Sequence, residues 1–220
     1  MKNVNKKIIY FLTLLIIISI PAFLTLKHKV KKYIKAHSIH EHGFWTDSFN
    51  EHRFDKGLAN AIAVYLTSQN VKDCADFGCG TSAYYVRHLN KQNIYCEGFD
   101  GNPNSYNISK GLVNVLDLAL SFDLNKKYEY AICLEVGEHI PKEYEKILID
   151  NLHRHNTKGI ILSWAIEGQG GRGHVNEQNN QYIKNIFSSL GYKNDIDAEN
   201  RLRSLANFSH FKRTVMVFNR

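Results

Sequence analysis

The sequence has little proline, no paired-cysteine motif and no internal repeat. Only 3 of its 220 residues are proline, beside 14 glycines, which excludes collagen-like and proline-rich low-complexity chains. None of the four cysteines has CxxC spacing, so no metal or redox site of that kind is present, and their apolar, strand-like surroundings predict buried, reduced thiols: Cys74, Cys79, Cys96 and Cys133. The 44% hydrophobic content excludes a disordered chain and predicts one globular domain.

Acidic residues are absent from the first 35 positions, which hold eight lysines. The whole chain has 28 basic and 21 acidic side chains, a net charge of +7. Subtracting the eight lysines leaves 20 basic against 21 acidic residues in 36–220, a net of −1. The basic excess therefore belongs to the N-terminal segment, and the rest of the chain lacks the broad positive surface expected of a nucleic-acid-binding protein.

The N-terminal segment contains a long uncharged run. Ile8–Leu26 is a stretch of 19 residues with lysines on both sides. As a helix it would extend about 28 Å, close to the thickness of the hydrocarbon core of a bilayer. This predicts a single-pass membrane anchor over residues 1–35, with a cleaved signal peptide and a buried core helix as alternatives.

Lysine asymmetry predicts how the anchor is oriented. Five lysines follow the run and three precede it, which favours a cytoplasmic location for the remainder of the chain. The Asn-X-Ser sequons at Asn107 and Asn207 are compatible with the opposite topology. Residues 36–53 are predicted to be a juxtamembrane linker, and the histidines His37, His40 and His42 are interpreted as part of that linker rather than as a metal site.

Residues 54–220 alternate between strand and helix patterns. Helices are expected at 54–68, 82–90, 142–154 and 177–190, and strands at 73–77, 94–99, 113–116, 130–134 and 159–164, with a final alternating pair around 213–218. This order predicts an α/β fold, a Rossmann-like, mostly parallel seven-stranded sheet with helices on both faces.

A glycine loop lies between the first strand and its helix. Gly78 and Gly80 let the backbone approach a ligand at the carboxyl end of the sheet. Taken alone, Gly78-x-Gly80-x-x-Ala83, with Asp100 twenty residues after Gly80, also fits a dinucleotide-binding site. Asp76, two residues before the first glycine, stands where NAD-binding strands usually have an apolar residue.

Four segments in order resemble class I S-adenosylmethionine-dependent methyltransferases of the small-molecule branch. They are Asp76-x-Gly78-x-Gly80, Gly98–Asn102, Ile132–Ile140 with its Glu-His pair, and Gly159–Ala165. The resemblance covers about residues 50–220 and implies S-adenosylmethionine as the cofactor. It implies that Asp100 binds the ribose hydroxyls, that Asp117 meets the adenine, and that the remaining cofactor contacts come from Asp76, Gly78, Gly80, Asn102 and Glu135.

Two histidines are candidates for proton transfer to or from a methyl acceptor. His139 follows the fourth strand, and His174 lies in a glycine-rich loop after the fifth. The alternative for His139 is a cap of the next helix. That loop, 168–177, is predicted to be a lid whose Gln169 and Arg172 bind the acceptor; the alternative is a surface loop in which Asn176 caps the next helix.

The predicted enzyme methylates a small or membrane-associated acceptor. No metal is expected, because Glu135, Glu138 and His139 do not reproduce the acidic cluster of metal-dependent O-methyltransferases. An NAD(P)-dependent oxidoreductase is disfavoured by Asp76 and by the lack of a Tyr-x-x-x-Lys pair, and a non-catalytic nucleoside-binding module by the intact loop. No Asn-Pro-Pro-Tyr motif supports methylation of nucleic acid.

Overall fold

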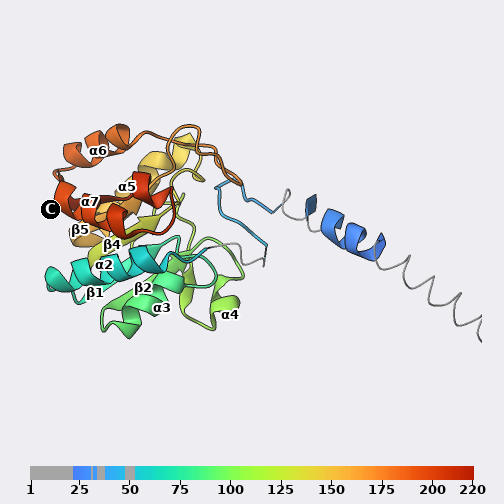
Figure 1. The fold of residues 1–220 in the computed structure, drawn as a ribbon, viewed down its shortest axis with the longest axis horizontal. Coiled ribbons are helices and arrows are strands. Elements are labelled where there is room, and N and C mark those ends of the chain that lie inside the picture. The colour runs from blue at the N-terminus through green and yellow to red at the C-terminus, as the bar shows by residue number, and fades with distance from the viewer. Residues whose placement is uncertain (1–21, 31, 34–37, 48–52) are drawn as a thin grey trace, which may run out of the picture. The chain divides into compact units, whose positions relative to one another are not determined.

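The computed structural model describes residues 22–30, 32–33, 38–47 and 53–220 (Figure 1). The chain divides into two compact units, Met1–Ile39 and His40–Arg220. Residues 22–30 of the first unit are helical. Among the described residues, no helix is both long and apolar enough to cross a membrane. Most of the predicted span, residues 8–21, lies outside the described residues.

The second unit is built on a seven-stranded sheet with the order β3-β2-β1-β4-β5-β7-β6. All neighbouring strands pair in parallel except at β7, which is antiparallel to both β5 and β6. The mostly parallel, seven-stranded Rossmann-like sheet is therefore confirmed. Its strands are β1 (Asp73–Phe77), β2 (Tyr95–Asp100), β3 (Val113–Val115), β4 (Tyr128–Leu134), β5 (Asn156–Ser163), β6 (Lys193–Asn194) and β7 (Met216–Asn219).

Helices cover both faces of this sheet (Figure 1). Along β1, Cys74 packs into a cluster with α2, α3 and α7, whereas Ala75 and Phe77 pack into a second cluster with α5 and α6. This alternation is expected of a strand that is buried on both sides. The helices are α2 (Lys56–Ser68), α3 (Tyr84–Lys91), α4 (Ser105–Ser109), the 3₁₀ turn η1 (Lys142–Tyr144), α5 (Glu145–Arg154), α6 (Asn180–Ser189), α7 (Ile196–Leu205) and α8 (Phe211–Thr214).

The sequence patterns located most elements and missed three short ones and the ten-residue helix α7. The strand β1 has the predicted bounds, but α4, α7, α8 and β6 were not predicted. The helix α6 begins three residues later than expected and is capped by Asn179, whose side chain accepts a hydrogen bond from the Tyr182 amide. Asn176 is therefore not the cap; its side chain donates to Glu145.

The segment predicted as a linker contributes to the domain. Residues 40–47 belong to the second compact unit. The Gly43 backbone lies so close to the His139 carbonyl that a Cβ would come within 2.0 Å of its oxygen. The Asn102 side chain donates to the Asp47 carbonyl at 2.8 Å, and Asn104 donates to that of Thr46 at 3.0 Å. The sequence predicted a linker because the segment is polar. The hydrogen bonds that tie it to the domain join residues far apart in the sequence, and such bonds leave no local sequence pattern.

Candidate active site

A cavity of about 300 Å³ opens at the carboxyl ends of β1, β2 and β4. Strand order reverses between β1 and β4, and such a point in a parallel sheet is where ligands bind. The walls come from the glycine loop, the ends of β2 and β4, residues 43–45 and the α7–α8 region. Among the predicted cofactor residues, the cavity is lined by Asp76, Gly78, Asp100, Asn102 and Glu135.

The glycine loop is held tightly against the neighbouring strands. The amides of Gly78 and Cys79 both donate to the Phe99 carbonyl, at 2.7 and 3.1 Å. Gly78 has φ +84° and lies so close to Val136 that a Cβ would meet its side chain at 2.3 Å. Both the backbone angle and the close approach therefore require glycine at position 78.

Asp100 organises the entrance of the cavity. One carboxylate oxygen accepts from the Gly80 amide and the other from the Asn102 amide, both at 2.9 Å. The Ser105 hydroxyl also donates to Oδ1, at 3.4 Å. Oδ2 therefore retains a lone pair for a ligand, and a ligand hydroxyl at Oδ1 would compete with this long hydrogen bond. Gly80 does not line the cavity itself; it positions the carboxylate that does.

Asp76 is buried, with 2% of its surface exposed, and its Oδ2 has no hydrogen-bond partner among the described residues. Burial, reinforced by the negative charge of Asp100, raises the pKa of Asp76 to about 8. A buried acceptor without a partner is costly. The site is therefore suited to a ligand that brings a cation or a hydrogen-bond donor to this carboxyl group.

Glu135 directly follows β4 and has a backbone conformation rare for a residue with a side chain, with φ +54°. Its amide donates to the Ser163 hydroxyl at 2.8 Å, which fixes this turn to β5. Its carboxylate accepts from the Gln169 side chain at 2.8 Å. Gln169, predicted to bind the acceptor, thus contacts Glu135 in this structure and does not line the cavity.

Three side chains gather beyond Glu135. Ligand atoms of Glu138, His139 and His174 all lie within 4.8 Å of one another. Glu138 is fully buried, and neither of its carboxylate oxygens has a hydrogen-bond partner among the described residues. Burial and the nearby charge of Glu135 raise its pKa well above the usual range. The two predicted catalytic histidines are thus brought together, at 4.9 Å between ring centroids.

The loop after β5 orients His174. The His174 Nδ1 lies 2.8 Å from a Glu177 carboxylate oxygen, while its Nε2 lies 4.0 Å from Glu138. Glu177 also accepts from the amides of Gly168 and Gly170, both at 2.7 Å, which holds the loop in shape. A carboxylate on one ring nitrogen of a histidine leaves the other nitrogen as an acceptor for a proton or a metal ion.

Arg172 joins this loop to residues 40–47. Its guanidinium forms an ion pair with the buried Asp47 and lies over the Trp45 ring, 4.4 Å from the centroid. Trp45 in turn packs edge-on against His139. Arg172, predicted to bind the acceptor directly, is half-buried and does not itself line the cavity, whereas Trp45 does.

Asp117 lies outside the cavity lining, next to Leu118, which is part of it. One of its oxygens accepts from the Ala119 amide at 3.0 Å, and the other lies 2.6 Å from the His42 Nδ1. The role of Asp117 at the adenine stays a prediction.

Sequence reasoning named Glu138 only as part of a set that does not form a metal site, and it assigned residues 40–47 to a linker. Glu138 follows Glu135 by three residues and precedes His139, so its signal was present as Glu-x-x-Glu-His. The partner that makes this a cluster, His174, is 35 residues further along the chain and is brought there only by folding. Trp45 left no signal, because the side chains against its ring, His139 and Arg172, come from distant segments.

Neither a protein-family model nor a curated protein sequence matches the chain. Its fold, however, is found in solved structures of class I S-adenosylmethionine-dependent methyltransferases, and the chain has that fold. The resemblance predicted from four sequence segments is thus confirmed at the level of the fold.

Three solved structures illustrate the likeness. Magnesium protoporphyrin IX methyltransferase from Synechocystis PCC 6803, with bound SAH, aligns with a TM-score of 0.54 at 19% identity, over 74% of this chain and 81% of that one. An amino pentose methyltransferase from Micromonospora echinaspora, with bound SAM, aligns with a TM-score of 0.57 at 12% identity, over 87% of this chain and 96% of that one. The N-methyltransferase NodS from Bradyrhizobium japonicum WM9, in complex with SAH, aligns with a TM-score of 0.53 at 13% identity, over 74% of this chain and 84% of that one.

Proposed function

We propose that the protein transfers the methyl group of S-adenosylmethionine to a small-molecule or membrane-associated acceptor. The observation that carries this proposal is the pair Asp76 and Asp100 in one cavity with the glycine loop between them. One carboxyl group faces the cavity with its oxygens already aligned by amides, and the other is buried without a partner for Oδ2.

The cofactor complements both groups. Two adjacent ribose hydroxyls suit the Asp100 carboxylate, whose two oxygens accept hydrogen bonds side by side. The α-ammonium of the cofactor would supply the missing partner of the buried Asp76 carboxyl group, directly or through water. Solved methyltransferases of the same fold hold SAM or SAH, which supports this assignment.

Cofactor binding is tested by calorimetric titration of the full chain in detergent with S-adenosylhomocysteine and, separately, with NAD. The Asp100→Ala variant is expected to lose about 100-fold in affinity for S-adenosylhomocysteine, because two hydrogen bonds to a charged group contribute about 1.5 kcal/mol or more each. Asp100→Asn separates the loss of charge from the loss of shape, and Asp123→Asn, an exposed acid, is the matched control. Binding of NAD but not S-adenosylhomocysteine would overturn the proposal.

The aromatic part of the cavity lining is suited to the acceptor. It consists of Trp45, Tyr84, Phe208 and Phe211, and His139 also belongs to the lining. His139 lines the cavity and is the proposed acceptor of a proton from a hydroxyl or amine as the methyl group arrives. His174 does not line the cavity; it packs against the His139 ring and is proposed to assist. The acceptor proposed here therefore has an apolar or planar part and an ionisable O–H or N–H group.

A specific observation favours a divalent cation at Glu138, His139 and His174. The carboxyl group of Glu138 is fully buried and has no hydrogen-bond partner in the described part of the chain. Together with the two imidazoles beside it, it has the donor set that a transition metal takes. A cation there would lower the pKa of an acceptor hydroxyl and so assist its deprotonation.

The cation is tested by the electron paramagnetic resonance signal of Mn²⁺ titrated with the chain. We expect Glu138→Gln to weaken Mn²⁺ binding by about tenfold or more, since the loss of a ligand costs at least as much as the loss of a group that orients one. Glu143→Gln, on the exposed surface of η1, should bind as the unmodified protein does. Equal Mn²⁺ affinity in the two variants would contradict the assignment.

We also propose that residues 8–26 anchor the protein in a membrane, with the enzyme domain on the cytoplasmic side. The support is the uncharged run and its flanking lysines, five after it and three before. The basic flanks would lie against anionic headgroups.

A further inference from the structure

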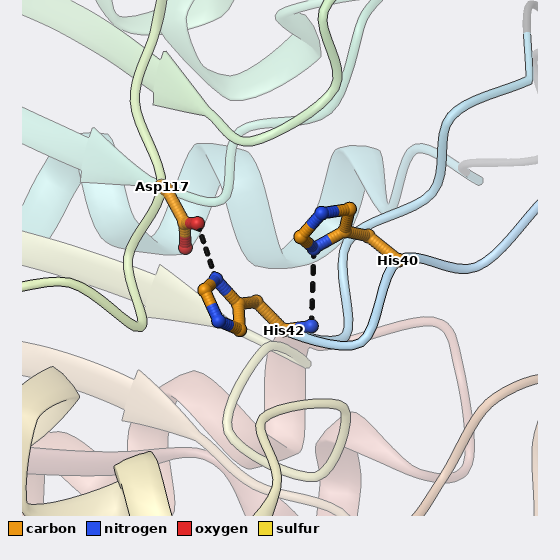
Figure 2. Close-up of side chains that lie close together, drawn as sticks. All are labelled: His40, His42 and Asp117. Carbon is orange, nitrogen blue, oxygen red and sulfur yellow. Dashed lines mark hydrogen bonds and ion pairs between the residues drawn. The ribbon is translucent and has the colours of Figure 1, made fainter.

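A second cluster of potential metal ligands lies apart from the first. Figure 2 shows His40 and His42 on one short segment, with the Asp117 carboxylate facing the His42 ring. The His40 Nδ1 accepts a hydrogen bond from the His42 amide at 3.2 Å. Their ligand atoms all lie within 4.8 Å of one another, and the His42 Nδ1 is 2.6 Å from Asp117 Oδ2. All three residues are partly exposed, so an ion could reach them from solvent.

The backbone presents both imidazoles together. The Gly43 amide donates to the His40 carbonyl and the His40 amide to the Phe44 carbonyl, both at 2.8 Å, so the chain turns tightly here. Gly43, at φ +92°, supplies the left-handed conformation of the turn. His40 and His42 therefore owe their proximity to main-chain geometry as well as to side-chain contact.

Neighbouring aromatic rings fix the orientation of each imidazole. The His40 ring stacks on Phe44 with centroids 4.3 Å apart, and the His42 ring packs edge-on against Tyr144 at 4.8 Å. Side chains held in this way lose little conformational entropy when they bind an ion.

The carboxylate is also held in place. Asp117 follows β3, and its Oδ1 accepts from the Ala119 amide at 3.0 Å. Its Oδ2 is thereby directed toward His42 (Figure 2). A hydrogen bond to one oxygen that leaves the other for an ion is the arrangement that commonly supports metal-binding carboxylates.

We propose that His40, His42 and Asp117 bind a divalent transition-metal ion of the zinc type. Two imidazoles and one carboxylate match the ligand preferences of Zn²⁺, with a fourth position left for water. On binding, the ion replaces the hydrogen bond between His42 Nδ1 and Asp117. The neutral imidazole of His42 then carries its ring proton on Nε2, the nitrogen that does not bind the ion.

The proposed ion would fasten residues 40–47 to the loop after β3. Gly43, Phe44 and Trp45 line the cavity on one side of this connection, and Leu118 lines it on the other. Two walls of the cavity that are distant in sequence would then be joined through one metal centre. We therefore expect Zn²⁺ to tighten the binding of S-adenosylhomocysteine, by linkage.

The test is a calorimetric titration of the metal-free full chain with Zn²⁺, repeated with Co²⁺, whose visible absorption reports nitrogen and oxygen ligation. It is carried out in the Glu138→Gln background, so that the other cluster does not contribute. We expect one Zn²⁺ per chain, and at least about tenfold weaker binding in His42→Ala, His40→Ala and Asp117→Asn. Glu41→Gln, an exposed neighbour in the same turn, is the matched control and should bind normally.

The proposal is overturned if Zn²⁺ does not bind in that background, or if His42→Ala and Glu41→Gln bind it equally well. Circular dichroism of each variant establishes that it is folded. The outcome is separate from that of the methyltransferase proposal, because metal binding is measured without cofactor or acceptor.

Discussion

Asp76 shows most directly how a single residue departs from its ordinary chemistry. Its pKa is raised from 3.8 to about 8 by burial and by the charge of Asp100. At pH 7 the carboxyl group is therefore mostly protonated in the empty protein. A bound ammonium group would favour the ionised form and return the pKa toward its usual value.

We expect binding of S-adenosylhomocysteine at pH 7 to release about one proton from Asp76, because the group changes from protonated to ionised. The release is measured by calorimetry in buffers of different ionisation enthalpy. The Asp76→Asn variant should release none. An observed enthalpy independent of buffer in the unmodified protein would contradict the role given to Asp76.

The same pKa shift has a consequence for stability. Between pH 3.8 and about 8 the folded chain keeps a proton that the unfolded chain has lost. The free energy of unfolding of the empty protein should therefore fall as pH rises through this interval. The fall should be smaller in Asp76→Asn, as measured by urea denaturation at several pH values.

At the scale of elements, Asp55 connects α2 to the segment between α7 and α8. It caps α2 by accepting from the Leu58 amide at 2.9 Å. Its other oxygen accepts from the amides of Asn207 and Phe208, at 2.8 and 2.7 Å, and the residue is fully buried. Because Phe208 lines the cavity, the cap of one helix also positions a wall of the site.

We expect Asp55→Ala to lower the free energy of unfolding by about 3 kcal/mol, since a helix cap and several buried amides lose their acceptor together. Asp55→Asn, which keeps one acceptor oxygen, should lose about half as much. Urea denaturation measures both variants. Unchanged stability in Asp55→Ala would show that solvent replaces the lost bonds.

At the scale of the whole molecule, the distribution of charge separates two parts of the chain. The first 35 residues carry eight lysines without acids, and the remainder has a net charge of −1. The lysines of the first 35 residues therefore support the proposed membrane anchor, whereas the cavity supports the proposed chemistry.

The proposed anchor is tested by alkaline extraction of membranes from cells that make the full chain. We expect the unmodified protein to stay in the membrane pellet. The double variant Leu15→Arg/Ile18→Arg should move to the supernatant, because each arginine at the centre of a span costs about 2.5–3.5 kcal/mol. Leu15→Ala/Ile18→Ala is the matched control and should stay in the pellet. Release of the unmodified protein would refute the anchor.

The sequence alone determined the class of fold, because strand and helix periodicity and the glycine loop are local properties. The strand β1 and the loop at Gly78 and Gly80 lie where the pattern predicted. Three of the missed elements, α4, α8 and β6, are short. The fourth, α7, has ten residues but buries only Ala198, Glu199 and Leu202, so it carries little apolar periodicity.

Only the tertiary structure decided which side chains meet. It brought His174 to Glu138 and His139, made residues 40–47 a wall of the cavity, and set Asp117 against His42 rather than in the cavity lining. These contacts join residues 35 to 125 positions apart in the sequence. Their energies depend on how close the side chains lie in space, which local sequence patterns do not report. The periodicity of each element is a local property of the sequence. The neighbours of a buried carboxyl group such as Glu138 are set only when the whole sheet has formed.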